Sequence, residues 1–291
     1  MEIMKIFITG GSGFIGRNLT EQLESKYTIF APNSLELNLL DEVAVLDYLQ
    51  QNKFDVVIHA ATWNATKTST KDTNLVLDHN LRMFFNLARG SGFYKKMLYF
   101  GSGAEFDRNH WIPKMNEDYF DSFVPTDQYG FSKYLMKKYT EKAENIINLR
   151  LFGVFGKYED WQIRFISQTC CRAIHDLPII INQNVNFDYT YIDDIVEITE
   201  WFIHNEPNAK SYNICTSNTY TLVELAKMVL DISGKQLEIR ITKEGMGREY
   251  SGTNTKLINE MNGFNFRNTE ECISELYKWY QNQTGIQVNK L

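Results

Sequence analysis

Cysteine, proline and histidine are scarce in this sequence, and their scarcity excludes several classes of protein. The 291 residues include four cysteines, five histidines and five prolines. No two cysteines have a CxxC spacing and the histidines are scattered, so we expect neither a disulfide framework nor a metal site. With 43% hydrophobic and 14% aromatic residues, the composition is that of a globular protein and not of a disordered chain.

Long runs of positive charge and long apolar runs are also missing. No Lys/Arg run exceeds two residues, and 30 basic against 36 acidic residues leave a formal charge of −6. Binding to a phosphate backbone needs a concentrated basic surface, so we expect no nucleic-acid partner. No stretch reaches the roughly 18 apolar residues of a membrane span, and the apolar N-terminal run is too short for a signal segment. We therefore expect a cytoplasmic protein with no membrane partner.

Short apolar runs alternate with helical stretches through the first half of the chain. The strand-like runs and the helical segments between them lie at 5–10, 17–25, 27–32, 41–51, 54–61, 75–90, 95–103, 129–144 and 145–156. Such spacing favours parallel strands joined by right-handed helical crossovers. The alternation loosens after about residue 157. We predict an α/β protein with a Rossmann-type, doubly wound parallel sheet and a smaller C-terminal region.

Gly10, Gly13 and Gly16 stand directly after the first predicted strand and at the start of the first predicted helix. The first glycine permits a tight turn, the second lets the backbone approach a pyrophosphate, and the third lets the helix pack on the strand. The N-terminus of the helix then offers N–H groups and a positive dipole to the anion. This context predicts a dinucleotide cofactor, bound by the turn residues Gly10, Ser12, Gly13, Phe14, Ile15 and Gly16.

The end of the second predicted strand bears on the choice of cofactor. An acidic residue there would hold a ribose 2′-hydroxyl and select NAD, but the positions concerned are Pro32, Asn33 and Ser34. A neutral turn does not repel a 2′-phosphate, although no arginine is present to bind one. We expect NADP(H) to be favoured over NAD(H), with Asn33 in the cofactor site.

With GGSGFIG at 10–16, HAA at 59–61 and the Tyr-x-x-x-Lys spacing of Tyr129 and Lys133, the chain resembles the extended short-chain dehydrogenase/reductases. Within them it is similar to the nucleotide-sugar epimerase/dehydratase/4-ketoreductase group, and nearest in pattern to GDP-fucose synthases and dTDP-4-dehydrorhamnose reductases. The resemblance implies NAD(P) as cofactor and a nucleotide sugar as substrate. It also adds three residues to the cofactor site, which are Asn38 in the ELNLLD segment, Ala60 and Ala61.

The segment FDYTYIDDIVE at 187–197 is similar to the RDFxxVDD segment with which this family returns to its cofactor domain. The resemblance therefore implies that the dinucleotide-binding domain comprises two pieces, residues 1–157 and about 187–206. A partly interleaved substrate-binding region then comprises about 158–186 and 207–291.

The resemblance implies a catalytic set of Ser102, Tyr129 and Lys133. In this family a tyrosine exchanges a proton with a sugar hydroxyl while the nicotinamide exchanges hydride at the same carbon. A free tyrosine has a pKa near 10 and needs a neighbouring cation for this task, and Lys133 lies one helical turn beyond Tyr129. Lys133 is also expected to hold the nicotinamide ribose. Tyr134 and Lys138 have the same spacing, and we interpret them as ordinary helix residues.

The residues around Ser102 discriminate among the reactions of the family. A 4,6-dehydratase needs a Thr-Asp-Glu arrangement where this chain has Ser102, Gly103 and Ala104, and GDP-fucose synthases have a cysteine at the Ala104 position. The resemblance thus implies neither dehydration nor double epimerisation. Glu105, which follows this segment, is an acidic residue at a position that is usually apolar in the family. Gly101 and Gly103 are expected to leave room for a bulky ligand, so that Ser102 and Gly103 both line the substrate site.

An arginine is expected to bind the diphosphate of the substrate. Arg248 resembles the family arginine in this role, and its contribution matters because Phe187 stands where the RDFxxVDD segment usually has another arginine. Arg164 and Arg172 are the alternatives. A guanidinium suits phosphate better than an ammonium does, because its planar fork can donate two parallel hydrogen bonds.

The chemistry that needs only Ser, Tyr, Lys and a nicotinamide is reduction of a nucleotide-activated 4-keto(-6-deoxy) sugar, serving polysaccharide or glycoside precursor synthesis. The first alternative is a nucleotide-sugar 4-epimerase that retains NAD. An alternative of another class is a non-catalytic dinucleotide-sensing protein. Family members commonly dimerise through the helices at 74–90 and 129–144, so the resemblance implies a homodimer with apolar surface from Leu81, Phe84, Phe85, Leu135, Met136 and Tyr139.

Overall fold

A parallel sheet of six strands forms the centre of the molecule. The computed structural model describes residues 3–63 and 68–283, and all statements on structure refer to these. Neighbouring strands run parallel in the order β10-β5-β4-β3-β1-β2, which reverses between β1 and β3. Ligands of such sheets bind at the carboxyl ends of the strands near this reversal. The strands are β1 (Lys5–Thr9), β2 (Thr28–Phe30), β3 (Phe54–His59), β4 (Tyr94–Ser102), β5 (Ile146–Leu151) and β10 (Ser211–Ile214).

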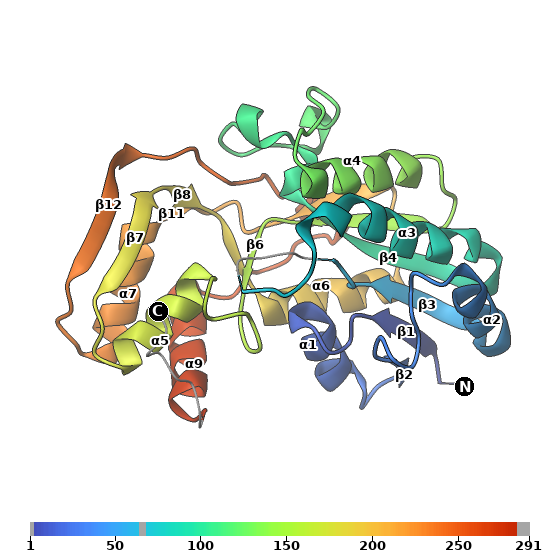
Figure 1. Cartoon of the computed structure of the whole chain (residues 1–291), viewed down its shortest axis with the longest axis horizontal. Helices are drawn as coiled ribbons and strands as arrows, with labels where there is room; N and C mark the ends of the chain where they lie inside the picture. Colours follow the sequence, from blue (N-terminus) through green and yellow to red (C-terminus); the bar gives the residue numbers. More distant parts are fainter. Residues whose placement is uncertain (1–2, 64–67, 284–291) are drawn as a thin grey trace.

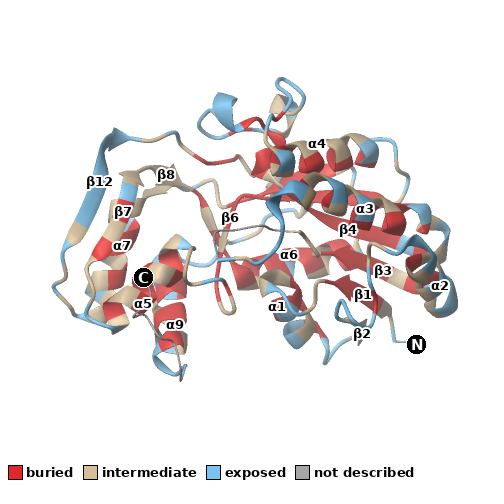
Figure 2. Ribbon diagram, viewed as in Figure 1, coloured by how far each residue is buried: buried red, intermediate tan, exposed pale blue. Residues whose placement is uncertain are grey.

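Helices cover both faces of the sheet (Figure 1), which confirms the predicted α/β fold class. One face packs against α1 (Phe14–Leu23) and α6 (Ile192–His204). Buried residues occupy much of α6 and of the sheet strands (Figure 2), and burying one leucine contributes roughly 1.5–3 kcal/mol. The opposite face packs against α2 (Glu42–Asn52), α3 (Val76–Arg89) and α4 (Gln128–Thr140).

A second lobe lies beside the sheet (Figure 1) and contains helices, two long strands and short strand pairs. Its long strands β7 and β12 pair in parallel, β6 pairs with β9, and β8 pairs with β11. The elements are β6 (Gly153–Phe155), α5 (Phe165–Ile174), β7 (Ile179–Asn184), β8 (Asn186–Phe187), β9 (Tyr189–Tyr191), β11 (Tyr220–Thr221), α7 (Leu222–Ser233), β12 (Ile239–Met246), α8 (Thr255–Glu260) and α9 (Thr269–Gln281). The 3-10 turns found in the described residues are η1 (Thr73–Leu75), η2 (Ser91–Phe93), η3 (Gly103–Glu105), η4 (Arg108–His110) and η5 (Glu117–Tyr119).

The chain passes more than once between the two lobes. The segment predicted as a single strand at 145–156 is two strands, β5 in the sheet and β6 in the second lobe. After β9, helix α6 returns to the sheet. The sequence-based division assigned everything after 206 to the substrate region, but β10 at 211–214 is hydrogen-bonded to β5 as an outer strand of the central sheet.

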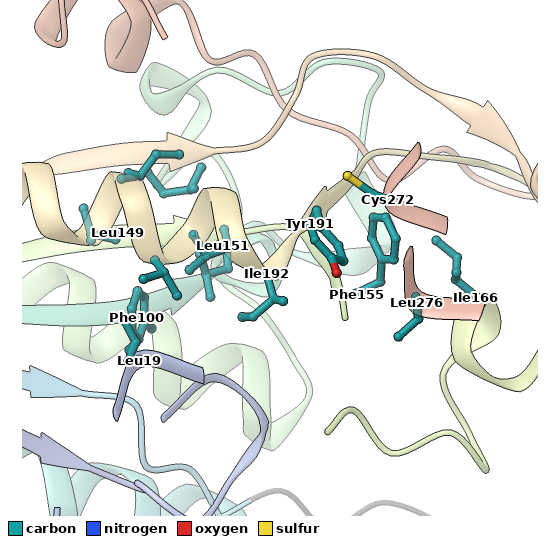
Figure 3. Packing of buried hydrophobic residues seen from close by; sticks show 14 of the residues in the cluster. Leu19, Phe100, Leu149, Leu151, Phe155, Ile166, Tyr191, Ile192, Cys272 and Leu276 are labelled. Atoms are coloured by element: carbon teal, nitrogen blue, oxygen red, sulfur yellow. The ribbon is translucent and has the colours of Figure 1, made fainter. Parts of the chain in front are cut away.

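One apolar core joins the lobes (Figure 3). Phe155 of β6 and Tyr191 of β9 have almost no solvent exposure, and they pack in one cluster with Ile166 of α5 and Leu276 of α9. The same cluster continues to Ile192 at the start of α6 and into the sheet. Because the core is continuous, the second lobe is held in place over the carboxyl ends of the sheet strands.

The faces of α3 and α4 expose less apolar surface than the homodimer prediction assumed. Phe84 and Met136 are buried in the core of the chain itself, at 0% and 1% exposure. The Tyr139 ring packs edge-on against Phe85, with 5.2 Å between ring centroids, although 40% of Tyr139 stays exposed. Two of the six named residues therefore have no surface to offer a partner, and the homodimer stays a prediction. In the described residues, no helix has both the length and the apolar character needed to cross a membrane.

Candidate active site

The glycine turn has the geometry that a bound pyrophosphate would need. Gly10 has a φ of +71°, and its carbonyl accepts a hydrogen bond of 2.9 Å from the Gly13 N–H. A Cβ on Gly16 would lie only 2.2 Å from the Gly10 oxygen, so helix and turn meet without space for a side chain. Gly13 caps α1 without a side-chain hydrogen bond, and the first helical turn, which begins at Phe14 and Ile15, has no acidic residue. The N–H groups of this turn thus face no competing anion of their own helix.

The residues after β3 lie against this turn. Ala60 and Ala61 follow the last strand residue, and a Cβ on Gly10 would lie 2.8 Å from the Ala61 backbone. The Ala61 N–H donates to the Thr9 hydroxyl at 3.2 Å, and Thr9 in turn pairs with His59 at 2.8 Å. These contacts hold the two strand ends together, so Ala60 and Ala61 border the glycine turn. Ser12 is exposed at its tip.

The turn after β2 carries a carboxylate that the sequence argument overlooked. Asn33 is followed by a turn in which its side chain accepts from the Leu35 N–H at 2.9 Å. The Glu36 carboxylate folds back and accepts from the Asn33 N–H at 2.8 Å, so this turn is not free of negative charge. Asn38 forms the next turn, with its side chain accepting from Leu40 at 3.1 Å.

Ser102 ends β4 and Tyr129 is the second residue of α4, and a close contact between α4 and the turn after β4 brings them together. Asp127 caps α4 by accepting from the Gly130 N–H at 2.9 Å, which places Tyr129 in the first helical turn. A Cβ on Gly130 would lie 2.7 Å from the Ala104 oxygen, so only glycine allows this approach. The Ser102 hydroxyl accepts from the Ala104 N–H at 3.1 Å.

Lys133 lies beneath the tyrosine with its ammonium buried. Its Nζ donates to the Phe100 carbonyl at 2.9 Å and lies 5.7 Å from the centre of the Tyr129 ring. Burial lowers the pKa of Lys133 to about 8, an effect that the nearby Glu105 carboxylate opposes. The spacing of Tyr129 and Lys133 thus brings a cation next to the phenol, as the sequence predicts.

The phenol of Tyr129 is partly buried and surrounded by groups that act on its ionisation. Burial raises the pKa of Tyr129, while hydrogen bonding with Ser102 lowers it. The positive charges of Arg164 and Arg108 also lower this pKa. Arg164 is the N-cap residue of α5 in the second lobe, and Arg108 lies in η4.

Tyr134 and Lys138, the pair with identical spacing, face away from Ser102. Both side chains donate to the Asp121 carboxylate, Lys138 at 2.8 Å and Tyr134 through a short hydrogen bond. They fasten the loop before α4 to the helix, and the interpretation as structural residues agrees with these contacts.

The space beside Ser102 is occupied by protein, which corrects the expected reason for two glycines. A Cβ on Gly101 would lie 2.1 Å from both Asn148 Oδ1 and Glu105 Oε1. A Cβ on Gly103 would lie 2.4 Å from the hydroxyl of Tyr250. Both glycines accommodate side chains of this chain and not a bulky ligand.

The predicted phosphate ligands differ in their surroundings. Arg248 is exposed and donates from Nη1 to the Arg108 carbonyl at 2.6 Å, while the Arg108 guanidinium pairs with the Asp127 carboxylate at 3.3 Å. Arg164 is exposed as well and acts on Tyr129 from the second lobe. Arg172 donates to the Pro178 carbonyl at 2.5 Å, so it holds the end of α5.

Sequence reasoning missed Tyr250, Trp111 and Arg108. Tyr250 is 7% exposed and its hydroxyl lies over Gly103. The Trp111 ring packs against it in a tilted arrangement with 4.2 Å between centroids, and Arg108 lies over Trp111 at 5.5 Å. No spacing within the chain relates position 250 to position 102, so only the proximity of Tyr250 to Arg248 in the sequence offered a signal.

Comparisons with known proteins show the family to which the chain belongs. The profile of the NAD dependent epimerase/dehydratase family matches residues 6–215. A GDP-6-deoxy-D-talose 4-dehydrogenase of Aggregatibacter actinomycetemcomitans is 24% identical, over 94% of this chain and 97% of its own length. A UDP-glucose 4-epimerase of Bacillus subtilis is 23% identical, over 95% of this chain and 96% of its own length.

Solved structures with this fold cover nearly the whole chain. A GDP-mannoheptose C4 reductase from Campylobacter jejuni with NADP bound has a TM-score of 0.84 at 19% identity, covering 97% of this chain and all of its own. A UDP-glucose 4-epimerase from Thermotoga maritima with UDP-glucose has a TM-score of 0.82 at 21% identity, covering 96% of this chain and 99% of its own. At these identities the likeness concerns the fold.

Proposed function

Because the chain belongs to the NAD dependent epimerase/dehydratase family, we propose that it reduces the 4-keto group of a nucleotide-activated 4-keto(-6-deoxy) sugar with NADPH. The observation that carries the proposal is the convergence of Ser102, Tyr129 and Lys133 at the carboxyl end of β4. No acid follows at Gly103 or Ala104, so the site has the groups for proton transfer at one oxygen but not those for loss of water.

The cofactor fits the carboxyl edge of the sheet. The glycine turn with Ser12, Phe14 and Ile15 would hold the pyrophosphate at the N-terminus of α1, with Ala60 and Ala61 beside it. Asn33 and Asn38 would border the adenosine, and Tyr129 and Lys133 the nicotinamide ribose. The bound nicotinamide supplies the hydride.

NADP(H) remains our proposal over NAD(H), because Pro32, Asn33 and Ser34 offer no charge against a 2′-phosphate. The Glu36 carboxylate, already engaged with the Asn33 N–H, opposes this preference and is the natural residue to vary in a test. The solved structures of similar fold include proteins with NADP and proteins with NAD.

Tyr129 is the proposed proton donor to the substrate oxygen. Its phenol is neutral at pH 7, since the ordinary pKa of tyrosine is near 10 and burial raises the pKa of Tyr129 further, so it carries the proton that a developing alkoxide needs. The charges of Lys133, Arg164 and Arg108 would stabilise the phenolate left behind. Ser102 would donate a hydrogen bond to the same substrate oxygen and orient it between the phenol and the nicotinamide.

The exposed guanidinium of Arg248 suits the diphosphate of a nucleotide sugar. A protein with a formal charge of −6 would repel such a group elsewhere on its surface. Arg248 is held beside η4 by its hydrogen bond to the Arg108 carbonyl and offers a positive charge there. Substrate binding by Ser102 and Arg248 stays part of the proposal. Gly103 would contribute only its backbone, since Tyr250 fills the space above it.

A nucleotide-sugar 4-epimerase with retained NAD is the second candidate, because Ser102, Tyr129 and Lys133 serve both reactions and similar proteins of both kinds cover the chain. The test is incubation of the purified protein with dTDP-, GDP-, CDP- and UDP-4-keto sugars and NADPH. Stoichiometric NADPH oxidation, with a product two mass units heavier than the keto sugar, supports the reductase. Co-purified NAD, with interconversion of UDP-sugar epimers, supports the epimerase. Cofactor binding without any turnover would contradict both.

A further inference from the structure

Tyr99 lies on β4 beneath the helix that carries Tyr129 and Lys133. Side chains of a strand alternate between the two faces of the sheet. Phe100 belongs to the core cluster on the side of α1 and α6, whereas Tyr99 belongs to the cluster under α2, α3 and α4. Tyr99 has no solvent exposure. The strand thus presents the ring of Tyr99 to the interior side of α4.

The ring of Tyr99 is held by two neighbouring elements. Phe84 of α3 packs edge-on against it with 5.0 Å between ring centroids, and the His59 ring of β3 is stacked beside it at 5.8 Å. His59 is itself paired with the Thr9 hydroxyl at 2.8 Å. The position of the Tyr99 ring is therefore set by the packing of the core.

The ammonium of Lys133 lies over the face of this ring. The distance from Nζ to the ring centre is 4.7 Å for Tyr99, shorter than the 5.7 Å for Tyr129. Both distances are within the range of a cation–π contact. Lys133 is 5% exposed, and its Nζ donates to a neutral group, the Phe100 carbonyl, at 2.9 Å. The Tyr99 ring is thus among the groups that replace water around a buried charge.

A buried ammonium needs such a replacement, because removal from water favours its uncharged form. The face of an aromatic ring carries negative partial charge and attracts a cation, and the attraction is stronger where both partners are desolvated. An ammonium has three N–H groups. The Phe100 carbonyl takes one and the Tyr99 ring faces another, so a third is left for the side of Tyr129.

We propose that Tyr99 is a positioning residue for Lys133, whose ring face keeps the ammonium charged next to the Tyr129 phenol. The contact depends on the ring and not on the hydroxyl, which has no hydrogen-bond partner among the residues that the structure describes. The inference rests on the proposed function, because it gives Lys133 the task of stabilising the phenolate that Tyr129 leaves behind.

The other groups around Lys133 do not make the ring redundant. Burial lowers the pKa of Lys133 to about 8, and the Glu105 carboxylate of η3 opposes this. Burial lowers the pKa of His59 to about 3, so this neighbour from β3 is neutral. Burial raises the pKa of both phenols, Tyr99 and Tyr129, so they are neutral as well. Loss of the ring should consequently lower the pKa of Lys133, since only the charged form is attracted to it.

The first test needs no substrate. Lys133 can be titrated by NMR in protein labelled at the lysine ε-carbon, its signal being identified by its absence in Lys133→Met. Tyr99→Leu should lower the pKa of Lys133 from about 8 to about 7, and Tyr99→Phe, which keeps the ring, should leave it near 8. An unchanged pKa in Tyr99→Leu, or an equal fall in Tyr99→Phe, overturns the proposal. Tyr99→Met, a more flexible apolar replacement, takes the same test if the leucine variant does not fold.

The matched control is Phe54→Leu. Phe54 belongs to the same core cluster and is 2% exposed, but it packs against Phe7 at 5.2 Å and not against Lys133. We expect a lower urea midpoint with an unchanged pKa of Lys133. A fall in this pKa equal to that of Tyr99→Leu would mean that any loosening of the core has the effect, and would overturn the role of Tyr99.

The second test is kinetic and uses the same three variants. Lys133 must be charged to stabilise the phenolate, so kcat should fall as the pH rises through its pKa. With a pKa near 7, Tyr99→Leu should have a kcat about fivefold below the parent value at pH 8 and within about twofold of it at pH 6. Tyr99→Phe should follow the parent profile. An equal loss at both pH values contradicts the inference, whereas failure of the substrate panel with the expected NMR titration contradicts only the proposed function.

Discussion

Arg150 and Glu105 form an ion pair with 2.7 Å between Nε and Oε2, and neither side chain has any solvent exposure. The pair lies directly behind Ser102. The Glu105 carboxylate also accepts from the Ser102 N–H at 3.1 Å and from the Asn148 amide at 3.1 and 3.0 Å. Arg150 donates from Nη1 to Asn213 at 2.8 Å. Glu105, the acid at a position that is usually apolar in the family, is thus engaged in holding the end of β4.

Arg150→Met should destabilise the protein by roughly 3–5 kcal/mol, because it leaves the Glu105 carboxylate buried without its counter-charge. Urea unfolding followed by circular dichroism measures this. The control is Arg240→Met, which removes one member of an exposed pair with Glu238 and should leave the stability nearly unchanged. Similar midpoints for the two variants would show that the buried pair does not hold the fold together.

Tyr129→Phe should lower turnover by about 10²–10⁴-fold with little change in cofactor affinity, as expected for loss of a general acid. Tyr134→Phe should leave turnover nearly unchanged, since its hydroxyl bonds Asp121 away from Ser102. Steady-state kinetics with the same keto sugar compares the two variants. Equal losses would contradict the assignment of Tyr129.

Stability should depend on pH through Glu159. Burial raises the pKa of Glu159 to about 8, and Ser167 donates to its carboxyl group at 2.6 Å. The folded state therefore keeps a proton that the unfolded state releases near its ordinary pKa of 4.5. The protonated Glu159 therefore contributes its full stabilisation below pH 4.5. This stabilisation is lost as the pH rises from there through about 8, and the free energy of unfolding falls by at most about 1.4 kcal/mol per pH unit. Glu159→Gln should flatten the pH profile of the urea midpoint, and an unchanged slope would contradict the raised pKa.

NADPH should bind about tenfold more tightly than NADH, a difference of about 1.4 kcal/mol, because the turn after β2 has no acid at 32–34. Glu36→Gln should raise the affinity for NADPH relative to NADH further, since it removes the carboxylate bonded to the Asn33 N–H. Isothermal titration calorimetry measures both ratios. Preference of the parent protein for NADH would overturn the expected choice of cofactor.

Arg248→Ala should raise the substrate KM by about tenfold to a hundredfold and leave NADPH binding unchanged, because a charge-assisted contact with the diphosphate is lost equally in the ground and transition states. Arg248→Lys should recover only part, since an ammonium cannot reproduce the fork. Arg172→Ala is the control, because Arg172 is engaged with the Pro178 carbonyl. If Arg248→Ala has the kinetics of the parent protein, Arg248 does not bind the diphosphate, and Arg164 becomes the residue to test.

Patterns of neighbouring residues in the sequence were sufficient to predict the parallel sheet and the turn and helix that carry the site residues. The glycine turn after β1 and the Tyr129–Lys133 spacing on α4 could be read from the sequence because each depends on residues within one turn or one helix. Strand alternation predicted a parallel sheet for the same reason. The outer strand β10 was missed because four residues at 211–214 have no periodic signal, and their pairing with β5 is set by contacts across 60 residues.

The residues that surround Ser102 could be identified only from the tertiary structure. The sequence by itself determined that a serine, a tyrosine and a lysine would meet at one edge of the sheet. It did not determine that the Glu105 side chain lies against Gly101 and the Tyr250 side chain against Gly103. A glycine in the sequence indicates that a side chain is missing, but not which group occupies the space. Burial of a charge or a phenol depends on every segment packed around it. Such packing joins residues more than 140 positions apart, and no spacing along the chain encodes it.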